Sequence, residues 1–471
     1  MSAGTSQAGP ATLGALRASG WSSRSVKDEV RDNLIAALRE GRNPFPGILG
    51  FEETVIPAIE RALLAGHDMI LLGERGQAKT RLIRSMVALL DEHIPAIEGC
   101  EINDDPLAPA CATCRDLVAA RGDDTPVTWV PRAKRYAEKL ATPDIAVADL
   151  IGDIDPIRVA EGRYLADERT IHYGLVPRTN RGIFAINELP DLPERIQVGL
   201  LNILEERDVQ IRGYSLRLDL DVLLIATANP EDYTNRGRII TPLKDRFGSE
   251  IRTHYPLHAA DEIAIVEQEM HPHAPVPVRI PAFIREILVE FTRLARRSPH
   301  VNQRSGVSVR FSIGNTETVV ASAVRRAVRT GEPEAVPRIC DLPAAQQSST
   351  GRVEFEAFEE GRESDILGRM LRQATLDTFR RRLAGVDVGA LQQRFDEGLS
   401  IETGELVSAT RVLDQIGEVP GLGKAMQRLG IEEESPALAA SAVEFLLEGM
   451  HLSKRLNKAA AGDGRVRYAG D

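Results

Sequence analysis

The chain has 471 residues, of which 43% are hydrophobic and 27% charged, as expected for a soluble globular protein with two to four domains. Its formal net charge of -11 argues against a general nucleic-acid-binding surface. No apolar run is long enough to span a bilayer, and the four cysteines of so long a chain provide no disulfide framework. We therefore expect a cytoplasmic protein with no membrane partner.

The N-terminal residues are rich in Ser, Ala and Gly, and they lack the basic start and apolar stretch of a secretory signal. Such a composition predicts a disordered tail over residues 1–28. Helical patterns follow at about Lys27–Glu40 and Phe51–Leu64, with a turn between them.

The stretch Gly73–Thr80, GERGQAKT, carries the strongest functional signal. It follows the apolar run Met69–Leu72 and precedes a helical pattern over Arg81–Leu90, which predicts strand, glycine-rich turn and helix. In this geometry backbone N–H groups cradle phosphates, while Lys79 would reach the β- and γ-phosphates and Thr80 would offer its hydroxyl to Mg²⁺. An ordinary glycine-rich turn is the alternative, but the flanking strand and helix favour nucleotide binding.

One position departs from the phosphate-loop pattern, which has Gly immediately before the lysine where this chain has Ala78. Gly73 and Gly76 still permit the tight turn. Because Ala78 opens the helix, we expect a right-handed helical conformation there and a mild departure. The candidate phosphate-binding residues are Gly73, Glu74, Arg75, Gly76, Gln77, Ala78, Lys79 and Thr80.

A second apolar strand, Gly182–Ile186, leads into Asn187 and Glu188. Aspartate is usual at the first of these two positions, and Asn187 keeps an oxygen ligand for Mg²⁺ without the charge, so we expect weaker metal binding. The carboxylate of Glu188 can orient and polarise an attacking water. A buried strand that ends in a polar turn is the alternative, which the spacing from the phosphate loop disfavours.

Two further polar residues complete the pattern. Asn229 follows the apolar strand Val222–Ala226, and an amide at that strand tip can contact the γ-phosphate and the water, although Asn-Pro is also a common turn starter. Arg246 follows a short helical segment. In a ring of subunits such an arginine stabilises the phosphoryl group in the neighbour's site; an ordinary surface arginine is the alternative.

Alternating strand and helix patterns up to about Tyr255 predict an α/β fold with a parallel sheet covered by helices. A further strand is expected at Val127–Val130, and helices beyond Pro256 at Asp261–Met270, Pro281–Ala295 and Thr316–Thr330. The expected organisation is a nucleotide-binding core at 29–255, an α-helical lid at 256–345, and an α-helical C-terminal region at 346–471 with a frayed end.

Together these elements resemble an AAA+ ATPase of the magnesium-chelatase ATPase-subunit and MoxR-like branch over roughly residues 46–330. The stretches that carry the resemblance are Tyr173–Gly182, Leu200–Arg207, Ile211–Arg217, Ala228–Asp232 and Asp245–Gly248. The resemblance implies a P-loop core with Walker A at Gly73–Thr80, Walker B at Asn187 and Glu188, sensor 1 at Asn229 and an arginine finger at Arg246.

The resemblance has further implications. It makes Ala78 a mark of the branch and places Ile48, Leu49 and Gly50 near the adenine. A sensor 2 arginine is expected where a lid helix begins. Arg310 is the first choice and Arg304 the second, with a basic surface loop as the alternative.

Three cysteines, Cys100, Cys111 and Cys114, lie in an insert at about 99–124. Three thiolates could hold Zn²⁺, but tetrahedral sites take four ligands. Candidates for the fourth are His93, Asp104 and Asp105, and three free thiols in an exposed insert are the alternative. Cys340 is distant in sequence and is expected to be a buried, small apolar residue.

The resemblance implies a hexameric ATPase that binds Mg-ATP and uses hydrolysis to remodel or activate a partner protein. That partner would carry a von Willebrand factor A (VWA) domain on a separate chain, since this chain has no DxSxS motif. An ATPase subunit of a Mg or Co chelatase is the second hypothesis. A switch with weak turnover, motivated by Asn187, is the third. A sigma-54-type activator is disfavoured because the sequence lacks a GAFTGA loop.

Overall fold

The computed structural model describes residues 9–160, 167–205, 208–211, 214–230, 239–271, 273–303, 305–417, 419, 421–431 and 435–470. The chain divides into two compact units, one of residues 1–74 and 78–254 and one of residues 75–77 and 255–471. Among the helices described, none combines the length and the apolar character needed to cross a membrane.

The first unit is built on a five-stranded parallel sheet with the order β11-β1-β10-β7-β4. Alternate residues of the interior strand β1 enter different cores: Ile70 and Leu72 face one side, and Met69 and Leu71 the other. Both faces of the sheet are therefore covered, as expected for parallel strands. The strands are β1 (Met69–Leu72), β4 (Tyr136–Leu140), β7 (Gly182–Asn187), β10 (Val222–Ala228) and β11 (Ser249–Arg252).

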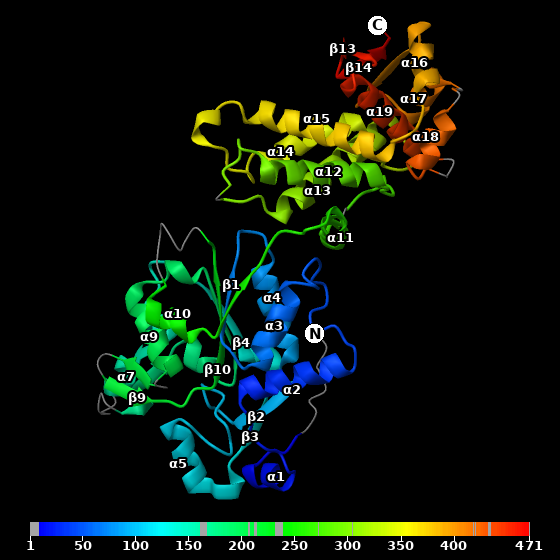
Figure 1. The fold of residues 1–471 in the computed structure, drawn as a ribbon. Coiled ribbons are helices and arrows are strands. Elements are labelled where there is room, and N and C mark those ends of the chain that lie inside the picture. Colours follow the sequence, from blue (N-terminus) through cyan, green and yellow to red (C-terminus); the bar gives the residue numbers. More distant parts are fainter. Residues whose placement is uncertain are drawn as a thin grey trace. The chain divides into compact units, whose positions relative to one another are not determined.

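Helices cover both faces of this sheet (Figure 1). One face carries α2 (Val26–Arg39), α3 (Val55–Leu64) and α4 (Lys79–Met86). The other core includes residues of α5 (Ala112–Arg121), α6 (Val147–Leu150), α8 (Leu175–Arg178), α9 (Glu194–Glu205) and α10 (Thr241–Arg246). The remaining helices of this unit are α1 (Leu13–Ala18) and α7 (Pro156–Ala160).

Among its described residues, this unit also has three two-stranded antiparallel sheets. The strand expected at Val127–Val130 forms, but it pairs with β2 in one of these small sheets and does not join the parallel sheet. The pairs are β2 (His93–Ile97) with β3 (Val127–Pro131), β5 (Gly152–Ile154) with β6 (Ile171–Tyr173), and β8 (Asp208–Ile211) with β9 (Tyr214–Arg217).

The N-terminal segment differs from the disordered tail that was expected. Leu13 and Leu16 are fully buried in α1, and the backbone N–H of Leu13 donates to the carbonyl oxygen of Thr125 at 2.9 Å. Thr12 caps the helix, since its hydroxyl oxygen accepts from Ala15 N–H. The helix α1 is thus held against residues 122–125, at the end of the insert.

The second unit is mainly helical, and one hydrophobic core runs through it from Phe283 to Tyr468. Phe283 stacks on Phe445 with ring centroids 4.6 Å apart, which joins the expected lid to the expected C-terminal region. The helices are α11 (Ala259–Glu269), α12 (Ala282–Arg297), α13 (Val309–Thr330), α14 (Ala345–Ser349), α15 (Glu363–Arg382), α16 (Gly389–Asp396), α17 (Ala409–Ile416), α18 (Leu422–Arg428) and α19 (Pro436–Leu452).

The chain ends in a small antiparallel sheet where a frayed end was expected. Its order is β12-β14-β13, with β12 (Ser400–Gly404), β13 (Asn457–Gly462) and β14 (Arg465–Ala469). Tyr468 of β14 is 1% exposed, and its hydroxyl donates to Glu448 Oε2 at 2.6 Å. This buried tyrosine fixes the last strand to the helical core.

Candidate nucleotide-binding site

The phosphate loop connects β1 to α4 at the carboxyl end of a central strand (Figure 1). Lys79 is 8% exposed, and its ammonium group donates to the carbonyl oxygens of Gly73 and Glu74, the latter at 3.0 Å. The side chain is therefore folded back along the loop. From there an ammonium group can contact phosphates that the loop backbone holds.

The conformation of Ala78 differs from the right-handed one that was expected. Its φ and ψ are 55° and 16°, in the left-handed region, and Gly76 before it also has a positive φ, of 75°. A side chain in this region is strained by about 1 kcal/mol, whereas glycine adopts it without cost. The departure from the usual glycine is therefore a source of local strain and is not mild.

Three polar side chains follow the ends of two neighbouring strands. Asn187 ends β7, Glu188 follows it, and Asn229 follows β10. Because β10 lies between β1 and β7 and all three strands are parallel, their carboxyl ends meet at one edge of the sheet. The sheet thus brings these three residues to the phosphate loop.

Asn229 links the phosphate loop to the residue that follows β7. Its Oδ1 accepts a hydrogen bond from Lys79 Nζ at 2.8 Å, and its Nδ2 donates to Glu188 Oε2 at 2.7 Å. The orientation of the amide is fixed chemically, since an ammonium group needs an acceptor and a carboxylate needs a donor. Lys79, Asn229 and Glu188 therefore form one hydrogen-bonded row from the phosphate loop to the end of β7.

The two oxygens expected at a magnesium ion also lie together. Thr80 Oγ1 donates to Asn187 Oδ1 at 3.4 Å, and Thr227 Oγ1 lies 3.5 Å from the same oxygen. A hydroxyl and an amide oxygen suit a hard cation that also keeps waters and phosphate oxygens as ligands. The pair provides no negative charge, so the charge balance would depend on the phosphates.

Glu188 has a constrained backbone. Its φ and ψ are 58° and 48°, an uncommon left-handed conformation for a residue other than glycine. Its N–H donates to the buried hydroxyl of Thr227 at 3.0 Å, and the next two residues, Leu189 and Pro190, are buried. The surrounding contacts thus hold the carboxylate in one place, and such strain is found mostly at functional sites.

Comparisons with known proteins agree with this geometry. The family described as the Sigma-54 interaction domain matches residues 159–246, a range that includes Glu188 and Asn229. The magnesium-chelatase 38 kDa subunit of Cereibacter sphaeroides is 28% identical over 236 residues, which are 47% of this chain and 62% of that subunit. The chain therefore resembles AAA+ proteins of the magnesium-chelatase branch.

A second curated relative gives similar values. The magnesium-chelatase subunit ChlI of Mesostigma viride is 30% identical over 220 residues, which are 45% of this chain and 56% of that protein. The chain thus spans about three fifths of the length of the curated relatives it matches. A solved chain from a complex of the BchI and BchD subunits of magnesium chelatase is 22% identical to this chain, with a TM-score of 0.36. The match covers 67% of this chain and 97% of the solved one.

The arginines expected as arginine finger and sensor 2 lie on other elements. Arg246 is exposed at the end of α10, a helix that buried Leu243 and Phe247 fix to the core. Arg310 belongs to the second unit, where it is exposed in the first turn of α13. Arg304, the other candidate for sensor 2, lies outside the described residues.

The three residues expected near the adenine are not equivalent. Ile48 is 3% exposed and packs in the core beside Phe45 and Phe51, so its side chain is taken up by the fold. Leu49 and Gly50 are half-buried. Leu49 and Gly50 are therefore more accessible to an adenine ring than the side chain of Ile48 is.

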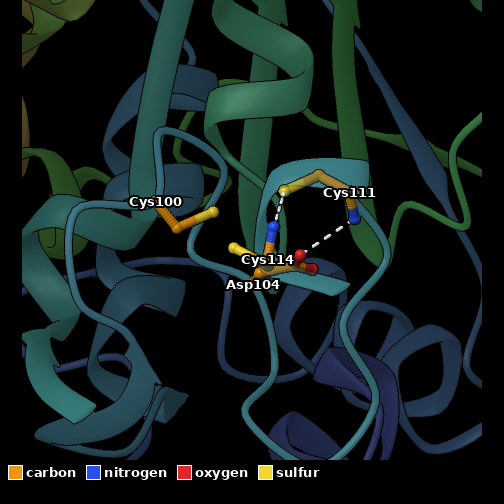
Figure 2. A group of neighbouring side chains, drawn as sticks. All are labelled: Cys100, Asp104, Cys111 and Cys114. Atoms are coloured by element: carbon orange, nitrogen blue, oxygen red, sulfur yellow. Dashed lines mark hydrogen bonds between the residues drawn. The ribbon is translucent and has the colours of Figure 1, made fainter. Parts of the chain in front are cut away.

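The cysteines lie together in the same unit, as a separate cluster. Cys100, Cys111, Cys114 and Asp104 each offer a ligand atom, and these four atoms lie within 4.8 Å of one another. Figure 2 shows Cys100 projecting from its loop toward the start of α5, which carries Cys111 and Cys114. We call these four residues the cysteine cluster. The sequence predicted the three thiols as possible ligands and left His93, Asp104 and Asp105 as candidates for the fourth ligand.

The three thiols of the cysteine cluster change one another's pKa values. Hydrogen bonds from Cys111 and Cys114 lower the pKa of the Cys100 thiol to about 4, and the same contacts with Cys100 raise the pKa values of the two partners. Burial raises the pKa of Asp104 to about 7. The contacts and burial within the cluster therefore favour a negative charge on Cys100 and oppose further ones on its neighbours.

The strain at Ala78 gives a first prediction. Ala78→Gly is expected to stabilise the first unit by about 1 kcal/mol, since glycine accepts the left-handed conformation. The midpoint of thermal unfolding, followed by calorimetry, should rise by a few degrees.

Ala36→Gly is the matched control, because Ala36 lies inside the right-handed helix α2. The same substitution there is expected to destabilise the protein by about 1 kcal/mol. If both variants lose stability, Ala78 is not strained.

Proposed function

We propose that the chain hydrolyses Mg-ATP at the edge of the parallel sheet and uses the reaction to remodel or activate a protein partner. The observation that supports this most strongly is the row Lys79–Asn229–Glu188, which links the phosphate loop to a carboxylate at 2.8 and 2.7 Å. A structural turn would not need a buried ammonium group, an amide and a strained glutamate in series.

Each residue has a distinct task in this proposal. Lys79 would exchange its carbonyl partners for phosphate oxygens. Glu188 would accept a hydrogen bond from the attacking water and take up its proton, while Asn229 would hold both the carboxylate and the γ-phosphate. A bound Mg²⁺, held by Thr80 and Asn187, would neutralise part of the phosphate charge.

Partner and assembly follow from the resemblance and belong to the same proposal. The chain would act as a hexameric ring in the cytoplasm, with a partner that carries a VWA domain on another chain. The ATPase subunit of a Mg or Co chelatase is the second candidate, and it is favoured by the relatives that are named magnesium-chelatase subunits. A neighbouring gene for a VWA-domain protein would favour the first candidate, and tetrapyrrole genes would favour the second.

A switch with weak turnover is the third candidate, motivated by the missing charge at Asn187. Phosphate release from ATP, measured with and without Mg²⁺, tests the proposal directly. Steady magnesium-dependent turnover supports hydrolysis. Tight ATP binding without turnover would contradict hydrolysis and support the nucleotide-dependent switch instead.

Arg246 gives the second prediction. Arg246→Ala is expected to leave the ATP dissociation constant within about twofold and to lower turnover by at least about 10³-fold, because an arginine finger acts on the transferring phosphoryl group. Lys244→Ala, on the same exposed stretch of α10, is the control and should keep its activity.

Mixing experiments locate the arginine. A ring that combines Arg246→Ala with Glu188→Gln subunits has intact sites that face intact arginines from their neighbours. Activity should therefore return on mixing if Arg246 acts across the interface. Loss of ATP binding in Arg246→Ala alone would show that the residue is structural.

A further inference from the structure

The insert between α4 and β3 contains a set of side chains that nucleotide chemistry does not use. The cysteine cluster unites Cys100, Asp104, Cys111 and Cys114, whose ligand atoms lie within 4.8 Å of one another (Figure 2). Asp104, Cys111 and Cys114 are 1%, 5% and 3% exposed, and Cys100 is half-buried. Three sulfur atoms and a carboxylate rarely share so small a buried volume unless a cation joins them.

The spacing suits a single metal ion. Two sulfur atoms bound to one zinc ion at about 2.3 Å in a tetrahedron lie about 3.8 Å apart, and a carboxylate oxygen lies slightly closer. The limit of 4.8 Å found here requires only a small contraction around the ion. A cluster of several metal ions would hold its ligands further apart.

The backbone already supports negatively charged ligands. The N–H of Ile102 donates to Cys100 Sγ at 3.4 Å, and the N–H of Cys114 donates to Cys111 Sγ at 3.3 Å. Donors of this kind stabilise thiolates, and Cys111 and Cys114 also lie at the N-terminus of α5, where the helix dipole favours negative charge. The loop thus offers backbone donors that would support the sulfur atoms as thiolate ligands once a cation binds them.

Asp104 is held in the same way. Its Oδ1 accepts from Ala110 N–H at 2.8 Å and its Oδ2 from Cys111 N–H at 2.9 Å. Within the described part of the chain, no lysine, arginine or histidine forms a salt bridge with this carboxylate. Backbone donors that orient a buried carboxylate are typical support for a metal ligand.

The other candidates for the fourth ligand are excluded by position. His93 is exposed on β2, and Asp105 faces Arg181 at 3.9 Å. Asn103 has a φ of 50° and donates from its Nδ2 to the carbonyl oxygen of Arg178 at 3.2 Å. The sharp turn at Asn103 is what carries Asp104 back toward the thiols.

We propose that the cysteine cluster binds one structural zinc ion, with Cys100, Asp104, Cys111 and Cys114 as its four ligands. Zinc suits the site because it accepts thiolate and carboxylate ligands in a closed tetrahedron and has no redox chemistry. Each ligand binds as an anion, so the thiols release their protons to solvent when the ion enters.

The zinc ion would fasten the insert to the segment that leads into β7. The N–H of Ala112 donates to Glu168 Oε1 at 2.7 Å, and Arg115 pairs with Glu168 Oε2 at 3.2 Å. Arg181, directly before β7, donates from Nη1 to the carbonyl oxygen of Pro95 at 2.7 Å. A fixed insert would thus support the strand that positions Glu188.

The test is the metal content of the full chain, purified with a thiol reductant and without chelator and measured by inductively coupled plasma mass spectrometry. About one zinc ion per chain is expected. Cys114→Ala should lower this below about 0.1, whereas Cys340→Ala, in the second unit, should keep the full amount. Asp104→Asn is expected to lose zinc to a chelator at least about tenfold faster, and Asp105→Asn at the normal rate.

A measurement on the unaltered chain covers the case in which the variants fail to fold. A mercurial that titrates thiols should release zinc, detected with a metal-binding dye, in step with three thiols. Replacement of zinc by Co²⁺ should give the visible absorption bands of a tetrahedral thiolate site. Zinc-free chain, iron in place of zinc, full zinc in Cys114→Ala, or a disulfide between two of these cysteines would each overturn the proposal.

Discussion

Glu188→Gln is expected to lower ATP turnover by about 10²- to 10⁴-fold, because the amide can no longer take a proton from the attacking water. Gln has nearly the same shape, and its side-chain oxygen can still accept the hydrogen bond that Asn229 Nδ2 now gives to Glu188 Oε2 at 2.7 Å. The site should therefore stay assembled. Phosphate release and equilibrium binding of ATP, measured on the same preparation, separate chemistry from affinity.

Glu194→Gln is the matched control, since this glutamate is exposed at the start of α9, shortly after Glu188. Its turnover should equal that of the unaltered chain. Turnover that is normal in Glu188→Gln would remove the glutamate from the mechanism. Loss of ATP binding in the same variant would assign it a structural role, which its left-handed backbone would then explain.

The second large effect concerns stability. Glu29 of α2 accepts two hydrogen bonds from Arg135, at 2.8 and 2.6 Å, and a third from Asp91 N–H at 2.6 Å. Arg135 is fully buried and also donates to the carbonyl oxygen of Arg181 at 2.8 Å. Glu29→Ala leaves the guanidinium group buried without its counter-charge, at a cost of about 3–5 kcal/mol.

Thermal unfolding measures this effect. The midpoint for the first unit should fall by roughly 10 °C in Glu29→Ala, as follows from the size of the unit. The double variant Glu29→Ala with Arg135→Ala should recover part of the loss, since no unpaired charge remains. Asp123→Ala, which removes the exposed partner of Arg17, is the control and should change little. If Asp123→Ala lowers the unfolding midpoint as much as Glu29→Ala does, the burial of the ion pair does not determine its contribution to stability.

Sequence alone predicted the site better than its surroundings. The phosphate loop, Glu188 and Asn229 each follow a strongly apolar strand, so their meeting at one sheet edge could be deduced from the parallel arrangement. The edge strand β4 was missed because its residues are only partly buried and include the charged Glu138 and Lys139. A half-exposed strand lacks the continuous apolar run that identified the others.

Other differences depend on contacts that are distant in sequence. The helix α1 is short, and its burial requires a backbone bond to Thr125, more than a hundred residues later. The left-handed Ala78 is set by the turn around it, and residue type alone would not have shown this. Asp104 could be preferred over His93 only once the turn at Asn103 was known.

The shared core of the second unit has a consequence for how these proteins vary. Phe283 on α12 stacks on Phe445 on α19, and the buried Tyr468 continues the same core into the last sheet. Residues 346–471 are therefore no detachable module, because cutting the chain near residue 345 would remove residues against which the lid core packs. A protein that binds the last sheet could therefore move the lid helices with it. An exchange of residues 346–471 between relatives would have to include the lid as well.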